Sequence, residues 1–179
     1  DIGQFSLSPP TSNRTGDFIY SSSALDVATI SGTTVTIIAS GQTIITATQL
    51  ANSKYKSAQI SMTLTVGKAT PIITFNDITR TFGDADFNLS ATSSSTGAFT
   101  YTISDNTIAT LTGSTTTIVG AGTTTVTVSQ AADTNYLAAT ATMTLTITKA
   151  TPVISFSDLS KTFGDADFNL SATSSSTGA

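Results

Sequence analysis

The sequence predicts an all-β protein, built as tandem Ig-like Greek-key β-sandwich domains in an extended rod. The first reason is a repeat, because Lys68 recurs 81 residues later as Lys149, and residues 81–98 recur unchanged as 162–179. A fixed period of this kind indicates one structural unit repeated in series. The second reason is that runs of Thr, Ile and Val alternate with Gly, Asn and Asp, as in short strands joined by turns.

The repeat divides the 179-residue chain into three parts. We expect residues 1–67 to be an Ig-like repeat that lacks its first strand, 68–148 to be a complete repeat, and 149–179 to be the N-terminal fragment of a third repeat. The two ends therefore look like cuts through a longer array. The fragment holds only the first two strands of a sandwich. We expect it to be unstable unless it docks on the preceding repeat or on an exposed edge of a neighbouring chain.

The clearest strand of the complete repeat runs from Ala139 to Thr148. Apolar residues occupy its odd-numbered positions and threonine occupies every even-numbered one, which is the pattern of a half-buried strand. The equivalent strand of the first repeat lies 81 residues earlier. Its predicted inward-facing residues are Ala58, Ile60, Met62, Leu64 and Val66.

Six shorter strands complete the repeat, giving about seven strands in roughly 80 residues, as in an Ig-like sandwich. Gly113-Ser114 predicts a two-residue hairpin, and Gly120-Ala121-Gly122 predicts a tight turn. At each junction a proline, Pro71 or Pro152, fixes φ and no Gly/Ser spacer occurs, so the linkers are expected to be semi-rigid. The six strands are expected at Pro71–Phe75, Phe87–Ala91, Phe99–Ile103, Ile108–Thr112, Thr115–Val119 and Thr123–Ser129.

The composition excludes several functions. The chain has no Cys, His or Trp, all 11 acidic residues are Asp, and the net charge is −4. Disulfides and thiolate metal sites are therefore excluded, and nucleic acid is an unfavourable partner. No apolar run is long enough for membrane insertion. A general base would have to be Asp, Lys or Tyr, so we expect no enzyme and no resident cofactor, calcium excepted.

Two carboxylate pairs are the candidate metal ligands. Asp84 and Asp86 lie two residues apart in the Gly83–Asp86 loop, and Asp165 and Asp167 repeat them. Such a pair can reach one Ca²⁺ ion, which prefers oxygen ligands. Alternatively, each Asp caps a turn through its own backbone hydrogen bonds. The first repeat favours this alternative, because Ile2 and Gln4 stand where the two Asp residues fall.

Other side chains admit a structural and a functional interpretation. Tyr55 and Tyr136 precede the last strand of each repeat, where they either plug the end of the sandwich or contact sugars. Packing is the favoured interpretation, as it is for Phe99 and Tyr101. The threonine rows are interpreted as the wet face of a twisted sheet rather than as an ice-binding surface.

Three segments of the complete repeat carry a family resemblance: Tyr101–Val128, Lys68-Ala-Thr-Pro71 at the junction, and Thr81-Phe-Gly-Asp84 in the early loop. They closely resemble bacterial Ig-like (Big) domains, and the two short motifs are similar to those of giant repeat adhesins of Gram-negative bacteria. The resemblance covers the whole chain. It implies a secreted protein on the extracellular face of the bacterial cell, in which such domains often act as spacers.

These observations together predict the structural stalk of a secreted bacterial cell-surface adhesin that projects a distal binding region, with gliding-type adhesins among the candidates. Its partners would then be the neighbouring repeats of the same chain. Two alternatives stay open. The repeats themselves bind a surface glycan or protein ligand multivalently, or they form an accessory module of a larger secreted enzyme or phage particle. Exposed aromatic residues clustered at one loop end would favour binding, whereas a smooth Thr/Ser surface would favour the spacer.

Overall fold

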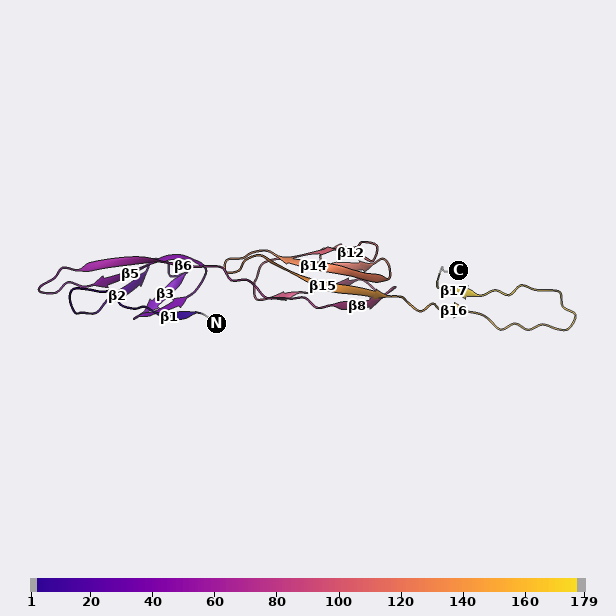
Figure 1. Ribbon diagram of the computed structural model, residues 1–179. Coiled ribbons are helices and arrows are strands. Elements are labelled where there is room, and N and C mark those ends of the chain that lie inside the picture. Colours follow the sequence, from indigo (N-terminus) through magenta and orange to yellow (C-terminus); the bar gives the residue numbers. More distant parts are fainter. Residues whose placement is uncertain (1–2, 177–179) are drawn as a thin grey trace. The chain divides into compact units, whose positions relative to one another are not determined.

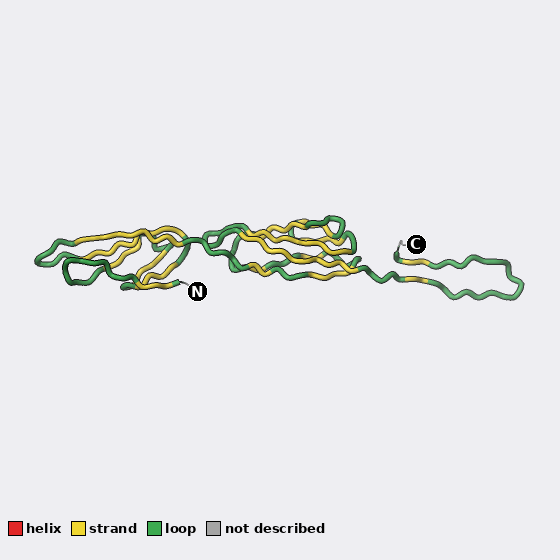
Figure 2. The backbone as a smooth tube through the Cα atoms, viewed as in Figure 1, coloured by secondary structure: helices red, strands yellow, loops and turns green. Residues whose placement is uncertain are grey.

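The computed structural model describes residues 3–176, and within this range it contains strands, turns and loops but no helix (Figures 1 and 2). The all-β fold class is therefore confirmed. It follows that none of the described segments is a helix able to cross a lipid bilayer. The residues at both ends of the predicted repeats, 1–2 and 177–179, lie outside the described range. Ile2, one of the two residues that align with the Asp pair, is among them.

Contacts between Cα atoms divide the chain into two compact units. The first unit comprises Asp1–Phe75, Ala91–Thr100 and Val128–Ala141, and the second comprises Asn76–Ser90, Tyr101–Thr127 and Thr142–Ala179. The strands before Gly67 lie wholly in the first unit. Several strands of the 68–148 segment have residues in both units, because they run continuously past the division.

Six strands precede Gly67, and they form two three-stranded sheets with the orders β1-β4-β3 and β2-β5-β6. The longest pairing among these strands is the antiparallel ladder between β5 and β6, in which Ile45 lies opposite Met62. The strand bounds are β1 Gln4–Ser6, β2 Ile19–Ser22, β3 Ala28–Ser31, β4 Thr34–Ile37, β5 Gly41–Gln49 and β6 Ala58–Val66.

Nine strands follow between residues 68 and 148. They form a four-stranded sheet in the order β11-β14-β15-β8, a three-stranded sheet β12-β13-β9 and the pair β10-β7. Within the four-stranded sheet, β8 is parallel to β15. The bounds are β7 Ile73–Thr74, β8 Ile78–Thr81, β9 Phe87–Asn88, β10 Thr92–Ser93, β11 Phe99–Ile103, β12 Ala109–Thr112, β13 Thr115–Ile118, β14 Gly122–Gln130 and β15 Ala139–Thr148.

The last part of the described chain contains only one short antiparallel pair, β16 (Ile154–Ser155) and β17 (Thr173–Ser174). Figure 2 shows that the segment between them is drawn as loop throughout. Every described residue from 149 onward is exposed. The pair repeats the β7–β10 pairing 81 residues later with the same register, since Ile73 lies opposite Ser93 and Ile154 opposite Ser174.

The core of each sandwich follows from the period-two alternation of its long strands. Val126 and Val128 of β14 are fully buried, as are Leu145 and Ile147 of β15, while the threonines between them are not. Because successive side chains of a strand point to opposite faces, one face is apolar and the other is wet. Burying an aliphatic side chain of this size stabilises the fold by roughly 1.5–3 kcal/mol, so these strands supply much of the stability of the repeat.

Several strand predictions are confirmed and others need correction. The strand Ala139–Thr148 has the predicted bounds, and the hairpin at Gly113-Ser114 is present, with Thr112 opposite Thr115 and a φ of 62° at Gly113. The predicted strand Pro71–Phe75 is shorter, and β8 and β10 were missed. These two strands contain only two to four residues, too few for alternation to distinguish them from loop.

The predicted inward face of the 58–66 strand is wrong for its first half. Met62 is 51% exposed, whereas Met143, the equivalent residue of β15, is 3% exposed. Ala58 and Ile60 are also exposed. The physical reason is that no described strand pairs with the outer edge of β6, whereas in the complete repeat Asp77 Oδ1 accepts a bond from Thr144 N, next to Met143, and β8 pairs with Leu145–Thr148.

Candidate functional site

The predicted carboxylate pair Asp84/Asp86 is held by hydrogen bonds within its own repeat. Asp84 Oδ2 accepts a bond from Thr81 N at 2.9 Å, and Asp84 N donates to Thr81 O at 3.0 Å. Gly83 closes this turn with a φ of 96°, a left-handed conformation that glycine adopts without strain. Asp86 Oδ2 instead accepts a bond from Thr117 Oγ1 at 2.9 Å. The two carboxylates therefore bind different partners.

The other repeats reproduce parts of this arrangement. Asp165 Oδ2 accepts a bond from Thr162 N at 2.8 Å, which is the same turn as that of Asp84. In the first repeat Gln4 replaces Asp86, and its Nε2 donates to Thr36 Oγ1 at 3.2 Å. Thr36 is the equivalent of Thr117, so the cross-strand contact persists without a carboxylate. A structural role explains this position in both repeats.

No group of three or more acidic, His or Cys side chains that could hold a metal ion occurs among residues 3–176. Asp167, the second carboxylate of the repeated pair, is exposed. The hydrogen bonds of Asp84 and Asp165 are those of the turn-capping alternative. We therefore expect turn capping rather than calcium binding at Asp84, Asp86, Asp165 and Asp167, which a calcium titration can test.

A buried glutamine at the end of β14 was missed by the sequence interpretation. The Gln130 side chain is 2% exposed, and its Oε1 accepts a bond from Ser93 Oγ at 2.6 Å. Its Nε2 donates to two main-chain oxygens, Ser95 O at 3.1 Å and Gly97 O at 2.9 Å. A buried amide is stable only when its donors and acceptor are paired. Gln130 therefore joins β14 to the 93–97 loop.

The first repeat contains the same clamp. Gln49 is 4% exposed, its Oε1 accepts a bond from Ser12 Oγ at 2.9 Å, and its Nε2 donates to Gly16 O at 2.9 Å. The recurrence of Gln49 as Gln130 was the signal available in the sequence. In the sequence, this glutamine could not be distinguished from a polar residue at the start of a loop, because only the fold shows that its side chain is buried.

Close packing beside the clamp requires a glycine. A Cβ atom added to Gly97 would lie 1.9 Å from the main-chain oxygen of Ala131. Ala131 N donates to Ala98 O at 3.0 Å, which holds the two segments together. Gly97 is therefore needed for a close approach of backbones.

Asp133 is the most highly bonded carboxylate of the described chain. Its Oδ2 accepts bonds from Ser95 Oγ at 2.9 Å, from Thr96 N at 2.9 Å and from Thr96 Oγ1 at 3.0 Å. Its Oδ1 accepts bonds from the main-chain N–H groups of Asn135 and Tyr136, each at 2.8 Å. The backbone N–H group of Thr96 is the largest influence on Asp133 and lowers its pKa. Desolvation opposes it, but the Ser95 hydroxyl and the N–H groups of Tyr136 and Asn135 add to the lowering, so the pKa of Asp133 lies well below its ordinary value.

The equivalent of Asp133 in the first repeat is Asn52, which keeps half of this arrangement. Asn52 Oδ1 accepts bonds from the N–H groups of Lys54 and Tyr55, each at 2.9 Å. An amide oxygen serves this turn as well as a carboxylate does. The negative charge of Asp133 is thus not needed for the turn, and its contribution is the additional contact with the 95–96 loop.

The tyrosines singled out in the sequence, and Lys68 at the junction, make contacts within the fold. Tyr136 is half-buried and its residue bridges Ala69, whereas Tyr55 is 45% exposed with the Arg14 guanidinium 5.9 Å from its ring centre. Lys68 is exposed, and its Nζ donates to the main-chain oxygen of Asp133 at 2.6 Å. None of these contacts assembles a nucleophile with a base.

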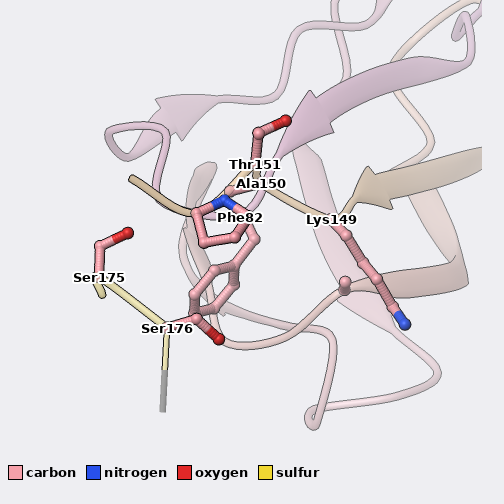
Figure 3. A pocket seen from close by; sticks show the side chains of 8 residues that line it. Phe82, Lys149, Ala150, Thr151, Ser175 and Ser176 are labelled. Atoms are coloured by element: carbon pink, nitrogen blue, oxygen red, sulfur yellow. The ribbon is translucent and has the colours of Figure 1, made fainter. Parts of the chain in front are cut away.

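A hollow of about 480 Å³ in the second unit is lined by Phe82, Ala121, residues 149–152, Ser175 and Ser176. Its only ionisable side chain is Lys149, and Figure 3 shows the ammonium group of Lys149 pointing away from Phe82 and the two serines. The hollow therefore brings no acid or base toward a bound molecule. Its lining offers apolar contact and hydroxyl groups alone.

A second, more apolar hollow of about 190 Å³ opens on the first repeat beside β6. We call it the β6 groove, and its floor includes Tyr20 and Ile45. The hydroxyl oxygen of Tyr20 is buried and has no hydrogen-bond partner within residues 3–176. The lining residues are Leu7, Ser8, Pro10, Tyr20, Ile45, Ala47, Ile60, Ser61 and Met62.

Comparison with known proteins identifies no family. No protein-family pattern matches this sequence, and no curated protein matches it. Structural similarity is weak: Drosophila N-cadherin EC1-3 has 10% identity and a TM-score of 0.34, covering 75% of this chain and 56% of that chain. Domains 4-9 of the surface layer protein SbsC have 16% identity and a TM-score of 0.35, over 83% of this chain and 25% of that one.

Human protocadherin-24 EC1-2 gives 10% identity and a TM-score of 0.35, covering 82% of this chain and 88% of that chain. The chain thus spans about half of the N-cadherin fragment and a quarter of the surface-layer fragment. Likenesses at these TM-scores carry no argument about function. The resemblance to bacterial Ig-like domains accordingly remains a proposal.

Proposed function

We propose that this chain is a stretch of spacer repeats from the stalk of a secreted bacterial cell-surface adhesin. Adhesins of the gliding type are one class to which such a protein would belong. The observation that carries the proposal is the repetition of structural contacts between successive repeats. The glutamine clamp of Gln130 recurs at Gln49, and the β7–β10 pair recurs as β16–β17. The features that the repeats share are therefore contacts that stabilise the fold.

The surface chemistry supports the same role. The outward positions of β15 are threonines, and those of β6 are Gln, Ser and Thr. The most strongly perturbed carboxylate, Asp133, is occupied by hydrogen bonds within its repeat. We therefore propose a protein that does not catalyse a reaction and whose main partners are the neighbouring repeats of its own chain.

Small-angle X-ray scattering of the full 179-residue chain tests the stalk directly. A compact protein of this length has a radius of gyration of about 16 Å. A rod formed by the two repeats and an extended 149–179 segment, each about 35–40 Å long at ~3.3 Å per strand residue, has a radius of gyration of about 30 Å. A value near 30 Å at concentrations where the measured mass is monomeric is the expected result. A value near 16 Å would contradict the proposal.

A variant with a short flexible Gly/Ser insert between Gly67 and Lys68 is the matched comparison. The natural junction has no such spacer, and Pro71 fixes the backbone just beyond it. Insertion should broaden the distribution of interatomic distances while leaving the circular dichroism spectrum unchanged. An unchanged distribution would mean that the natural junction is already flexible, which a stiff stalk does not permit.

A further inference from the structure

The junction between the first and the complete repeat lies inside one compact unit. The first unit holds the strands before Gly67, the linker that follows them, and the loop Asp133–Leu137, which we call the junction loop. The division between the two units falls instead within the strands of the 68–148 segment. Contacts between the first repeat and the junction loop are therefore contacts within a single compact unit.

Main-chain hydrogen bonds fasten the linker to the junction loop. Ala69 N donates to Asn135 O at 2.8 Å, and Leu137 N donates to Ala69 O at 2.8 Å. Between these two bonds, Ala69 forms a parallel bridge with Tyr136. Such bonds use groups that every residue except proline possesses. They hold the linker, but they do not distinguish one repeat from another.

A side chain of the junction loop binds the first repeat directly. Asn135 Oδ1 accepts a bond from Ser40 N at 2.8 Å, and Ser40 Oγ donates to Thr134 O. Ser40 is half-buried and lies in the turn between β4 and β5. The turn thus offers two donors, and the junction loop offers two acceptors. Asn135 binds the linker with its main-chain oxygen and the turn with its side-chain oxygen.

The junction loop is preformed by bonds within its own repeat. Asp133 Oδ1 accepts the N–H groups of Asn135 and Tyr136 at 2.8 Å each, and Asp133 N donates to Tyr136 O at 3.1 Å. The other carboxylate oxygen is bound by the 95–96 loop. Because the Asn135 side chain is presented on a fixed turn, its contact with the first repeat requires little additional ordering.

The first repeat has the same turn with a different side chain at the recognition position. Asn52 replaces Asp133, and its Oδ1 accepts two main-chain N–H groups in the same way. Lys54 stands where the complete repeat has Asn135. An ammonium group has donors but no acceptor, so it offers nothing to a main-chain N–H group. A loop with lysine at this position therefore does not accept the Ser40 turn in the same way.

The turn that is recognised also differs between the repeats. Ala121 is the equivalent of Ser40, so the turn of the complete repeat has no hydroxyl donor. The backbone of the turn is kept, because the next residue is glycine in both repeats, Gly41 and Gly122, with φ of 147° and 155°. Both contacting residues thus vary on a constant backbone frame. This pattern favours discrimination between alternative partners over a general role in folding.

We propose that Asn135 and Ser40 form a recognition contact that matches the complete repeat to the repeat that precedes it. The inference deepens the proposed spacer role and rests on it in one respect, because it takes neighbouring repeats of the same chain as the partners. Tandem repeats of nearly identical sequence are prone to incorrect association. A contact that depends on both side chains favours docking of the junction loop on the correct turn.

Amide exchange of Ser40, measured by NMR on the full 179-residue chain, tests the contact. Asn135→Lys installs the residue of the first repeat and leaves the main-chain bonds of the linker in place. It should make the Ser40 amide exchange about fivefold faster, the effect of losing one hydrogen bond. Asn135→Asp keeps an acceptor oxygen and should retain the protection. Ile38 and Ala39 are internal controls, because their N–H groups bond to Val27 O within the first repeat.

The expected result is faster exchange at Ser40 alone, in Asn135→Lys alone. An unchanged Ser40 amide would overturn the recognition contact. Equal acceleration at Ser40, Ile38 and Ala39 would also overturn it, because the substitution would then act on the stability of the whole repeat. The same effect in Asn135→Asp as in Asn135→Lys would show that the acceptor oxygen is not what binds the turn.

This measurement is independent of the scattering experiment on the stalk. An extended radius of gyration, together with a Ser40 amide that does not respond to Asn135→Lys, would keep the spacer role and overturn the recognition contact. A compact radius of gyration, together with faster exchange at Ser40, would overturn the spacer role and keep the contact.

Discussion

Replacement of Gln130 by alanine should be among the most damaging polar substitutions in the complete repeat. Its side chain makes three hydrogen bonds at 2.6, 3.1 and 2.9 Å and is almost fully buried. A net contribution of about 1 kcal/mol for each bond gives a loss of about 3 kcal/mol.

Native-state hydrogen exchange is the appropriate assay, because it reads the complete repeat separately from the rest of the chain. A loss of about 3 kcal/mol corresponds to amide exchange roughly 100-fold faster in β14 and β11. Gln49→Ala removes two such bonds from the first repeat and should cost about 2 kcal/mol there. The two variants should each affect their own repeat.

An exposed glutamine provides the control. Gln42 makes a single long bond to Thr65 at 3.2 Å on the surface of β5, so Gln42→Ala should change stability by less than about 0.5 kcal/mol. If Gln130→Ala cost less than about 1 kcal/mol, or no more than Gln42→Ala, the buried clamp would not be a major source of stability. The reasoning from burial and hydrogen-bond number would then be refuted.

Three further predictions concern the backbone, pH and metal. Gly97→Ala should lower the thermal midpoint of the complete repeat by several degrees, because its Cβ would lie 1.9 Å from a main-chain oxygen, whereas Gly67→Ala has open space and should be tolerated. Asp133 has a folded-state pKa below its unfolded value, so its stabilisation is present above pH ~4 and is lost as pH falls toward the folded pKa. Asp133→Asn should therefore flatten the acid limb of the stability profile. Millimolar Ca²⁺ should leave the unfolding midpoint unchanged, since Asp84 and Asp86 are each bonded within the repeat.

A specific result would contradict each of these three predictions. Equal midpoints for Gly97→Ala and Gly67→Ala would show that the 97–98 segment can move away from Ala131. An unaltered acid limb in Asp133→Asn, measured beside the exposed Asp26→Asn as control, would assign the pH dependence to other carboxylates. A rise of the midpoint in Ca²⁺ that is reversed by chelator and absent in Asp84→Asn would establish a calcium site.

The candidate site residues could be identified from the sequence, but their structural or functional role could not. The Asp84/Asp86 spacing could be recognised as a possible ligand pair, and the capping alternative could be stated. The choice between them depends on which donors lie near each oxygen. Thr117, the partner of Asp86, is 31 residues away in the chain. Spacing along the chain cannot show such a contact.

The sequence by itself determined the all-β class, the 81-residue repeat and the strand Ala139–Thr148, because local alternation and near-identity are properties of the chain alone. Only the tertiary structure decided which apolar faces are covered. Met62 and Met143 occupy identical Met-Thr-Leu-Thr segments, yet one is exposed and the other buried. The difference depends on contacts with segments that are distant along the chain, so the burial of a residue is decided by its neighbours as much as by its own side chain.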